Sequence, residues 1–260
     1  MAIWLCTPTL GHAQTISVGG TGGALAVLEQ LGRAFALDHP GVRLDVLPSM
    51  GSSGGIRALG DGAIDIAVSG RSLRAEEQEG GALVEVPFAR TAIAFLTSHR
   101  GEINLPVEMA VEMFGDAGAT WSDGTDVRIV ARPQSESDYQ AITSVYPLMQ
   151  DALARAGERP DVPVAVTDQE NLELAAMMEG SLTVGTVLQV WSEDVPLYLL
   201  ALDGTAPTLD NVASGRYPLV KEYCLVFRAD ADPIVQDFIG FIEAEAGAEI
   251  LRRAGALPVE

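Results

Sequence analysis

Residues 51–71 read GSSGGIRALGDGAIDIAVSGR, and this stretch contains the pattern that decides the fold. A Gly/Ser-rich turn at 51–55 opens a helical segment, an apolar strand follows at 64–68, and another Gly/Ser-rich turn begins at Ser69. Small residues at such turns leave the backbone N–H groups of a helix start open to a ligand. The stretch therefore predicts strands that run into helices, with a candidate anion site at the turns.

Short apolar strands and amphipathic helices alternate along the rest of the chain. We expect strands at 16–18, 42–47, 64–68, 84–97, 127–131, 164–166, 183–190, 198–202 and 217–227. We expect helices at 24–37, 106–114, 138–156 and 171–178, and a helix pair at 233–254. This alternation is typical of an α/β sheet with helices packed on it.

Two long strands, at 84–97 and 217–228, enclose a self-contained α/β unit of about 120 residues. Two long strands of this kind are expected where the chain passes from one lobe to the other and back. We therefore expect a two-lobed α/β protein in which residues 14–88 plus 216–260 form lobe 1 and residues 89–215 form lobe 2. A ligand cleft is expected between the lobes.

The charge and the rare residue types exclude several classes of partner. The 260 residues include 36 acidic and 16 basic side chains, a formal charge of −20, and a single lysine, Lys221. Nucleic acid is therefore not an expected partner, because phosphate contacts need clustered basic residues. Three scattered histidines, two cysteines and the lack of a Walker lysine indicate no metal site and no cofactor.

The N-terminus resembles the end of a secretory signal. Residues 1–13 carry no charge and end in Gly-His-Ala, which places small residues before a cut at Gln14. The basic region that usually begins a signal peptide is missing. We expect cleavage to remove Cys6 and the mature protein to be periplasmic, with Cys224 as an inert thiol in a buried strand.

Three Gly/Ser-rich turns, at 19–23, 51–55 and 69–72, each follow a strand. Taken singly, each is also an ordinary helix cap or turn. In a parallel sheet the strand-to-helix turns share one edge, where open α/β folds bind ligands, so three such turns favour an oxyanion pocket. Arg71 adds a permanent cation there, although a salt bridge to Glu76 or Glu77 would also explain it.

An enzyme is not expected. The motif Gly51-x-Ser53-x-Gly55 matches the nucleophile elbow of serine hydrolases. That mechanism needs an acid and then a histidine beside the serine, and the only downstream histidine, His99, follows a strand assigned to the crossing between lobes. No residue is therefore expected to be catalytic.

Four stretches, at 20–22, 51–71, 207–219 and 238–259, resemble the substrate-binding proteins of phosphate-type ABC transporters, in the periplasmic binding protein superfamily. The resemblance implies a type II two-lobed fold that closes on phosphate or a related oxyanion by hinge motion. It also implies a monomer that delivers this ligand to an ABC transporter permease without covalent chemistry. Two other hypotheses stay open: the same fold with a different small solute, and a ligand-sensing or interaction module with a degenerate cleft.

The resemblance places ligand contacts at Thr21, Gly22, Ser52, Arg71 and the second-lobe Arg132. Neighbouring small and hydroxyl residues of the turns extend this set. The candidate ligand-binding residues are Thr21, Gly22, Ser52, Ser53, Gly54, Ser69, Arg71, Arg132, Ser135 and Ser137.

Two departures from the family bear on the ligand. Members that bind hydrogen phosphate often carry an aspartate where this chain has Gly70, and a Ser-Gly-Thr cradle where residues 135–138 read SESD. We interpret Asp138 as half of a capping box with Ser135 and leave the direction of Glu136 open. A similar capping box, Thr167 with Glu170, is the favoured interpretation of the polar turn at 167–171, where Asn171 could alternatively reach a ligand.

Overall fold

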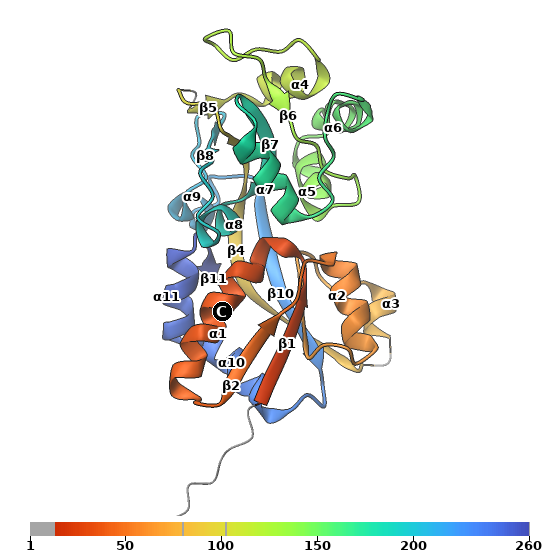
Figure 1. Cartoon of the computed structure of the whole chain (residues 1–260), viewed down its shortest axis with the longest axis vertical. Coiled ribbons are helices and arrows are strands. Elements are labelled where there is room, and N and C mark those ends of the chain that lie inside the picture. Colours follow the sequence, from red (N-terminus) through yellow and green to blue (C-terminus); the bar gives the residue numbers. More distant parts are fainter. Residues whose placement is uncertain (1–13, 80, 102, 260) are drawn as a thin grey trace, which may run out of the picture.

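The computed structural model describes residues 14–79, 81–101 and 103–259, and within them the chain forms two α/β lobes (Figure 1). The strands β4 (Leu83–Thr97) and β10 (Val220–Arg228) run between the lobes. The predicted signal peptide and Cys6 lie outside the described residues. In the part of the chain that the structure describes, no helix has the length and apolar composition needed to cross a membrane.

Lobe 1 is built on a sheet in which three parallel strands are followed by the two crossing strands, in the order β2-β1-β3-β10-β4. Its other elements are β1 (Gln14–Gly20), η1 (Gly22–Ala24), α1 (Leu25–Asp38), β2 (Val42–Val46), α2 (Gly51–Gly60), β3 (Ile66–Ser69), α3 (Ala75–Gln78), α10 (Pro233–Glu243), α11 (Glu245–Arg253) and β11 (Leu257–Pro258). β3 is buried along its whole length because it lies at the centre of this sheet.

Lobe 2 contains the remaining elements. They are β5 (Asn104–Leu105), α4 (Val107–Gly115), β6 (Arg128–Ile129), α5 (Ser137–Val145), α6 (Met149–Glu158), α7 (Asp168–Met177), β7 (Ser181–Thr186), α8 (Val187–Ser192), β8 (Tyr198–Leu199), β9 (Ala201–Leu202) and α9 (Leu209–Ala213). The sheet here is β4-β7-β6, with β7 antiparallel to β4 and parallel to β6.

The long strand β4 joins the two sheets by changing its partner. From Leu83 to Ala92 it pairs with β10, and from Ile93 to Leu96 it pairs with β7. One continuous strand therefore belongs to both lobes, and α1 and α2 of lobe 1 lie opposite α7 and α5 of lobe 2 (Figure 1).

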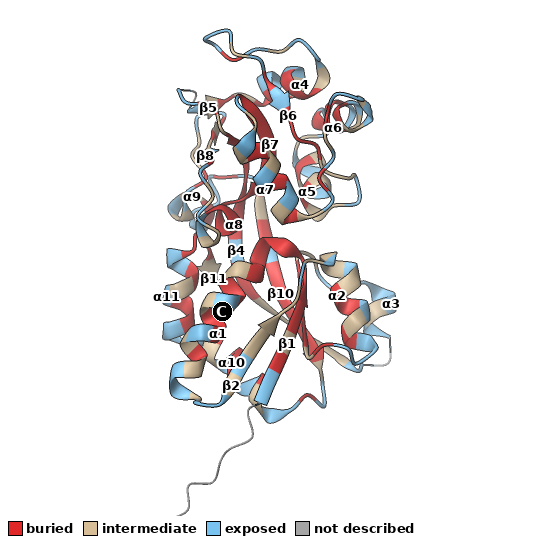
Figure 2. Cartoon of the chain, in the orientation of Figure 1, coloured by how far each residue is buried: buried red, intermediate tan, exposed pale blue. Residues whose placement is uncertain are grey.

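Each lobe has its own apolar core (Figure 2). Phe95, Phe114 and Trp121 lie in the core of lobe 2, and Phe35 and Phe238 lie in the core of lobe 1. Two separate cores are what independent lobes require. The boundaries at 88/89 and 215/216 stay a prediction.

Four expected elements were wrong: the helix at 138–156 and the strands at 164–166, 183–190 and 198–202, the last of which is divided into β8 and β9. The expected helix at 138–156 is two helices, because Pro147 falls between α5 and α6 and cannot donate a backbone hydrogen bond. The expected strand at 183–190 ends at Thr186, whose Oγ1 accepts a hydrogen bond from the N–H of Gln189 and caps α8. A short apolar run fits a buried helix as well as a strand, and periodicity cannot separate them.

The structure gives the outcomes for the expected strand at 164–166 and for Cys224. The segment at 164–166 forms an isolated bridge between Val164 and Ala131 rather than a strand. Cys224 is buried in β10, and burial raises the pKa of its thiol, as expected of an unreactive core cysteine.

Candidate functional site

The three Gly/Ser-rich turns of lobe 1 meet at the sheet edge that faces lobe 2. The N–H of Thr21 donates to the carbonyl of Val68 at 3.0 Å, and the N–H of Met50 donates to the carbonyl of Gly20 at 3.0 Å. The N–H of Gly70 donates to Oγ of Ser52, also at 3.0 Å. Backbone bonds therefore fix the ends of β1, β2 and β3 relative to one another, as the parallel arrangement predicts.

Two glycines make this close approach possible. A Cβ at Gly55, in the first turns of α2, would lie 2.7 Å from Cα of Gly20. Gly20 itself has a φ of +141°, and a Cβ there would lie 2.0 Å from the carbonyl oxygen of Val68. The glycines thus allow the start of α2 to lie directly on the end of β1.

A cavity of about 300 Å³ lies between the starts of α2 in lobe 1 and α5 in lobe 2. Hydroxyl, arginine and small residues dominate its wall. Its lining residues are Thr21, Met50, Gly51, Ser52, Ser53, Gly54, Arg71, Arg74, Ser135, Glu136, Ser137 and Gln140. We call this space the α2–α5 cavity.

Both helices begin at this cavity without a side-chain cap. Met50 precedes α2 and Glu136 precedes α5, and neither side chain accepts a hydrogen bond from its helix. The expected capping box between Ser135 and Asp138 is therefore wrong. Each helix start carries unpaired N–H groups and about half a positive charge, so two such ends facing one cavity favour an anion there.

Arg71 lines the cavity and is held in place by a carboxylate. Its two terminal nitrogens donate to Glu77 at 2.8 and 2.7 Å, and Nη2 also donates to Oγ of Ser53 at 3.0 Å. The guanidinium of Arg71 lowers the pKa of Glu77 below its ordinary value, mainly through these hydrogen bonds. The salt bridge considered from the sequence is thus present, and it orients Arg71 toward the serine turn.

Seven of the ten sequence-predicted residues line the α2–α5 cavity: Thr21, Ser52, Ser53, Gly54, Arg71, Ser135 and Ser137. The other three lie beside it. Ser69 is buried at the end of β3, where its hydroxyl donates to the carbonyl of Arg71 at 2.6 Å. Gly22 packs against Asp168 and Gln169, and Arg132 contacts Glu136 and Asp168.

The lack of a side chain at position 70 is explained by a buried ion pair next to it. Nζ of Lys221 lies 2.5 Å from Oδ1 of Asp138, and the two side chains are 5% and 10% exposed. A Cβ at Gly70 would lie 2.5 Å from Cε of Lys221 and 3.2 Å from Oγ of Ser137. The lysine side chain therefore takes the room that a larger residue at 70 would need.

The ion pair with Lys221 also explains how the carboxylate of Asp138 can be buried near a proposed anion site. Burial lowers the pKa of Lys221 and is the largest single influence, but Asp138, Tyr223 and Asp168 together outweigh it and raise that pKa above its ordinary value. The ammonium is therefore charged and neutralises Asp138. Asp138 is thus not a free carboxylate facing an incoming anion.

Glu136 differs from Asp138 because it lines the cavity. Burial raises the pKa of its carboxyl above the ordinary 4.5, although the nearby Arg132 acts in the opposite direction. Its Oε2 accepts a hydrogen bond from Nη2 of Arg132 at 3.1 Å. The direction left open by the sequence is settled: the side chain faces the site.

Sequence reasoning missed four residues of this region: Arg74, Gln140, Asp168 and Lys221. Arg74 follows Arg71 by three residues and was detectable as a second cation of the same turn. Asp168 directly follows Thr167, which caps α7 as expected by accepting from the N–H of Glu170. Neither Gln140 nor Lys221 carries a local motif, since only tertiary packing brings them to the site.

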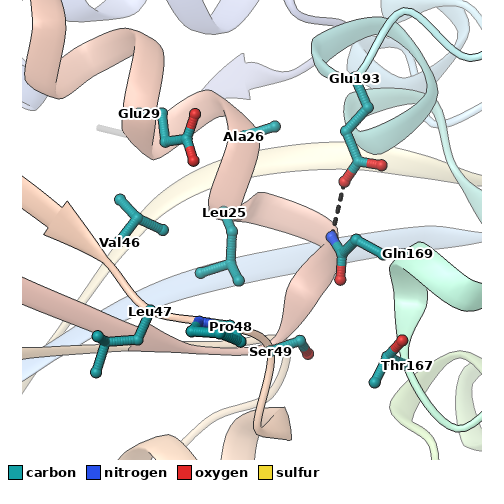
Figure 3. A pocket seen from close by; sticks show the side chains of 10 residues that line it. All are labelled: Leu25, Ala26, Glu29, Val46, Leu47, Pro48, Ser49, Thr167, Gln169 and Glu193. Atoms are coloured by element: carbon teal, nitrogen blue, oxygen red, sulfur yellow. Dashed lines mark hydrogen bonds between the residues drawn. The ribbon is translucent and has the colours of Figure 1, made fainter.

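A second cavity, of about 490 Å³, also lies between the lobes (Figure 3). It is mostly apolar, with Leu25, Val46 and Pro48 in its wall. Its charged groups are the carboxyls of Glu29 and Glu193, and Gln169 donates to Glu193 at 2.8 Å. No arginine or lysine of the described residues lines this cavity, although Arg33 pairs with Glu29 at 3.5 Å on the exposed surface, so the cavity is the poorer oxyanion site despite its size.

The geometry does not assemble the hydrolase alternative. Oγ of Ser53 accepts a hydrogen bond from Arg71, whereas His99 stacks on Trp121 and lies 3.7 Å from Asp123. In the part of the chain that the structure describes, no residue contacts both Ser53 and His99. Asn171, which could have reached a ligand, is buried and donates to the carbonyl of Val184.

Comparisons with known proteins identify the family. A family model described as a PBP superfamily domain matches residues 7–245. The phosphate-binding protein PstS of Borreliella burgdorferi is 25% identical over 260 residues, covering 96% of this chain and 91% of that protein.

Solved structures share the fold. A protein of Clostridium perfringens, described as a phosphate ABC transporter substrate-binding protein with bound phosphate, superposes with a TM-score of 0.79 at 20% identity, covering 95% of this chain and 100% of that one. An ABC-type phosphate transport receptor of Vibrio cholerae gives 0.62 at 19% identity, covering 94% and 99%. The two-lobed α/β fold and the resemblance expected from the four motifs are confirmed.

Proposed function

The chain belongs to the PBP superfamily, and from this we propose that it is a substrate-binding protein that captures inorganic phosphate or a related oxyanion between its lobes. The ligand would lie in the α2–α5 cavity and would be released to an ABC transporter permease. Relatives described as phosphate-binding proteins support this proposal.

The observation that carries the proposal is the pair of uncapped helix starts, one from each lobe, at a single cavity. Backbone N–H groups there cost no side-chain entropy to position, and the helix dipoles favour negative charge. Hydroxyls of Ser52, Ser53 and Ser137 add donors, and Arg71 and Arg74 add charge. A tetrahedral oxyanion would be contacted from both lobes, so its binding would favour the closed arrangement.

We propose no chemical step for this site. Its groups are suited to donating hydrogen bonds to an anion, and relatives are described as transport proteins rather than enzymes. The protein would therefore act by binding and releasing an unchanged ligand.

The location and partners follow the same proposal. The protein would be exported to the periplasm, act as a monomer and dock on the permease with both lobes. The hinge would lie where β4 passes from β10 to β7, with lobes divided at 88/89 and 215/216.

Isothermal titration of the full chain with inorganic phosphate tests the proposal. We expect saturable 1:1 binding that weakens at least tenfold in Ser52→Ala and in Arg71→Ala, since each change removes donors at the cavity. Ser144→Ala, an exposed serine on α5 outside the cavity, is the matched control and should bind like the wild type. No heat of binding with phosphate, arsenate or sulfate at millimolar concentration would contradict the proposed function.

A further inference from the structure

Asp168 already occupies donors that were expected to hold the ligand. Its Oδ2 accepts from the N–H of Gly23 at 3.0 Å and from Oγ1 of Thr21 at 3.4 Å, and its Oδ1 accepts from Nη2 of Arg132 at 3.0 Å. The side chain is 11% exposed. A carboxylate is a planar oxyanion, so these groups already hold an anion that belongs to the protein itself.

The contact joins the two lobes. Asp168 is the first residue of α7 in lobe 2, whereas Thr21 and Gly23 lie at the start of η1 in lobe 1. Beside it, Nε2 of Gln169 donates to the carbonyl of Gly22 at 3.1 Å. Both interactions are direct contacts between protein groups, so this pair of residues connects the lobes.

The packing at this point is tight. A Cβ at Gly22 would lie 2.8 Å from Oδ2 of Asp168 and 2.4 Å from Oε1 of Gln169. The hydroxyl of Thr21, which precedes η1, makes no cap bond to its own helix. Asp168 therefore takes the place of a cap for a helix start in the opposite lobe.

Arg132 differs from Arg71 because it serves two carboxylates. Its Nη1 donates to the carbonyl of Ala165 at 2.9 Å, and Nη2 donates to both Asp168 and Glu136. One guanidinium thus serves two carboxylates, and its side chain is 8% exposed. An oxyanion that approached this group would meet a net negative charge.

We propose that Asp168 is a resident carboxylate of the inter-lobe site that bridges the lobes without ligand and restricts the oxyanion to the α2–α5 cavity. Asp168 thereby sets the affinity for phosphate below the value that the same fold would reach with a neutral residue at this position. The proposal rests on the proposed function for its affinity part, while the bridging part concerns the ligand-free protein alone.

The test uses Asp168→Asn, which keeps the size of the side chain and removes its charge. Glu173→Gln is the matched control, because it removes the same charge from the exposed face of the same helix. Asp168→Ser is a second variant that retains a residue favoured near helix starts. Small-angle X-ray scattering of the ligand-free chains measures lobe separation, and calorimetric titration measures phosphate affinity.

We expect both Asp168 variants to have a larger ligand-free radius of gyration than the wild type and Glu173→Gln. We also expect Asp168→Asn to bind phosphate at least tenfold more tightly, and Glu173→Gln to stay within twofold of the wild type. An unchanged radius in both Asp168 variants, or equal or weaker phosphate binding by Asp168→Asn, overturns the inference. If phosphate bound to none of the chains, the proposed function would fail, and the ligand-free radius alone would decide whether Asp168 bridges the lobes.

Discussion

The buried pair of Lys221 and Asp138 allows a quantitative prediction. Replacing Lys221 with methionine fills a similar volume but leaves the Asp138 carboxylate, which is 10% exposed, without its partner at 2.5 Å. Breaking a buried ion pair on one side costs about 3–5 kcal/mol. The start of α5 offsets about 0.3–1 kcal/mol of this, because Asp138 lies in its first turn. We therefore expect Lys221→Met to lower the free energy of unfolding by about 3 kcal/mol.

The assay is urea unfolding followed by circular dichroism, with thermal unfolding as a second measurement. For a chain of this size the expected loss corresponds to a fall in Tm of about 6–12 °C. Adding Asp138→Leu removes the orphaned charge and should recover at least half of the loss. Arg33→Met, which breaks an exposed pair with Glu29, should cost under about 0.5 kcal/mol. A loss below about 1 kcal/mol in Lys221→Met would refute the reasoning that the pair is buried and dry.

Three other changes have defined outcomes. Glu136→Gln should tighten phosphate binding about fivefold in calorimetry at pH 7 by removing a charge that lines the cavity, and weaker binding would contradict this. Gly55→Ala should cost about 1–3 kcal/mol in urea unfolding, because its Cβ meets backbone at 2.7 Å, whereas Gly60→Ala on the same helix meets nothing and should not destabilise. Arg71 lowers the pKa of Glu77 from 4.5, so this pair stabilises the fold above pH 4.5 and the stabilisation is lost as the pH falls through the lower folded-state pKa. Glu77→Gln should remove this part of the dependence of Tm on acid pH. An unchanged profile of Tm against pH would contradict the prediction.

Much of the fold could be predicted because its signals are local. The apolar stripe of α1, the long strands β4 and β10, and the Gly/Ser turns each follow from spacing and residue type within one segment. The errors arose where local patterns are ambiguous. The apolar run after Thr186 fits a strand or a helix, and only the cap made by Thr186 starts the helix there.

The candidate site was predictable for the groups that lie on turns and not for those that depend on pairing. Ser52 and Arg71 were expected at the cavity because the parallel sheet brings its turns to one edge. Lys221 lies 83 residues from Asp138, and Asp168 lies 36 residues from Arg132, so no local motif could indicate these two pairs. The pairing of Arg132 with Glu136, four residues away, is local. The distribution of charge in this cleft is therefore a property of tertiary packing.

The location of the bound anion is the measurement that decides most directly between this account and its alternatives. Crystals of the full chain grown with arsenate, a tetrahedral oxyanion with an anomalous signal, would show where the ligand lies. We expect one strong anomalous peak in the α2–α5 cavity, within hydrogen-bond distance of Oγ of Ser52 and of the backbone N–H groups at the start of α5. A peak only outside this cavity, or none at saturating arsenate, would contradict the assignment of an oxyanion site to these two helix starts.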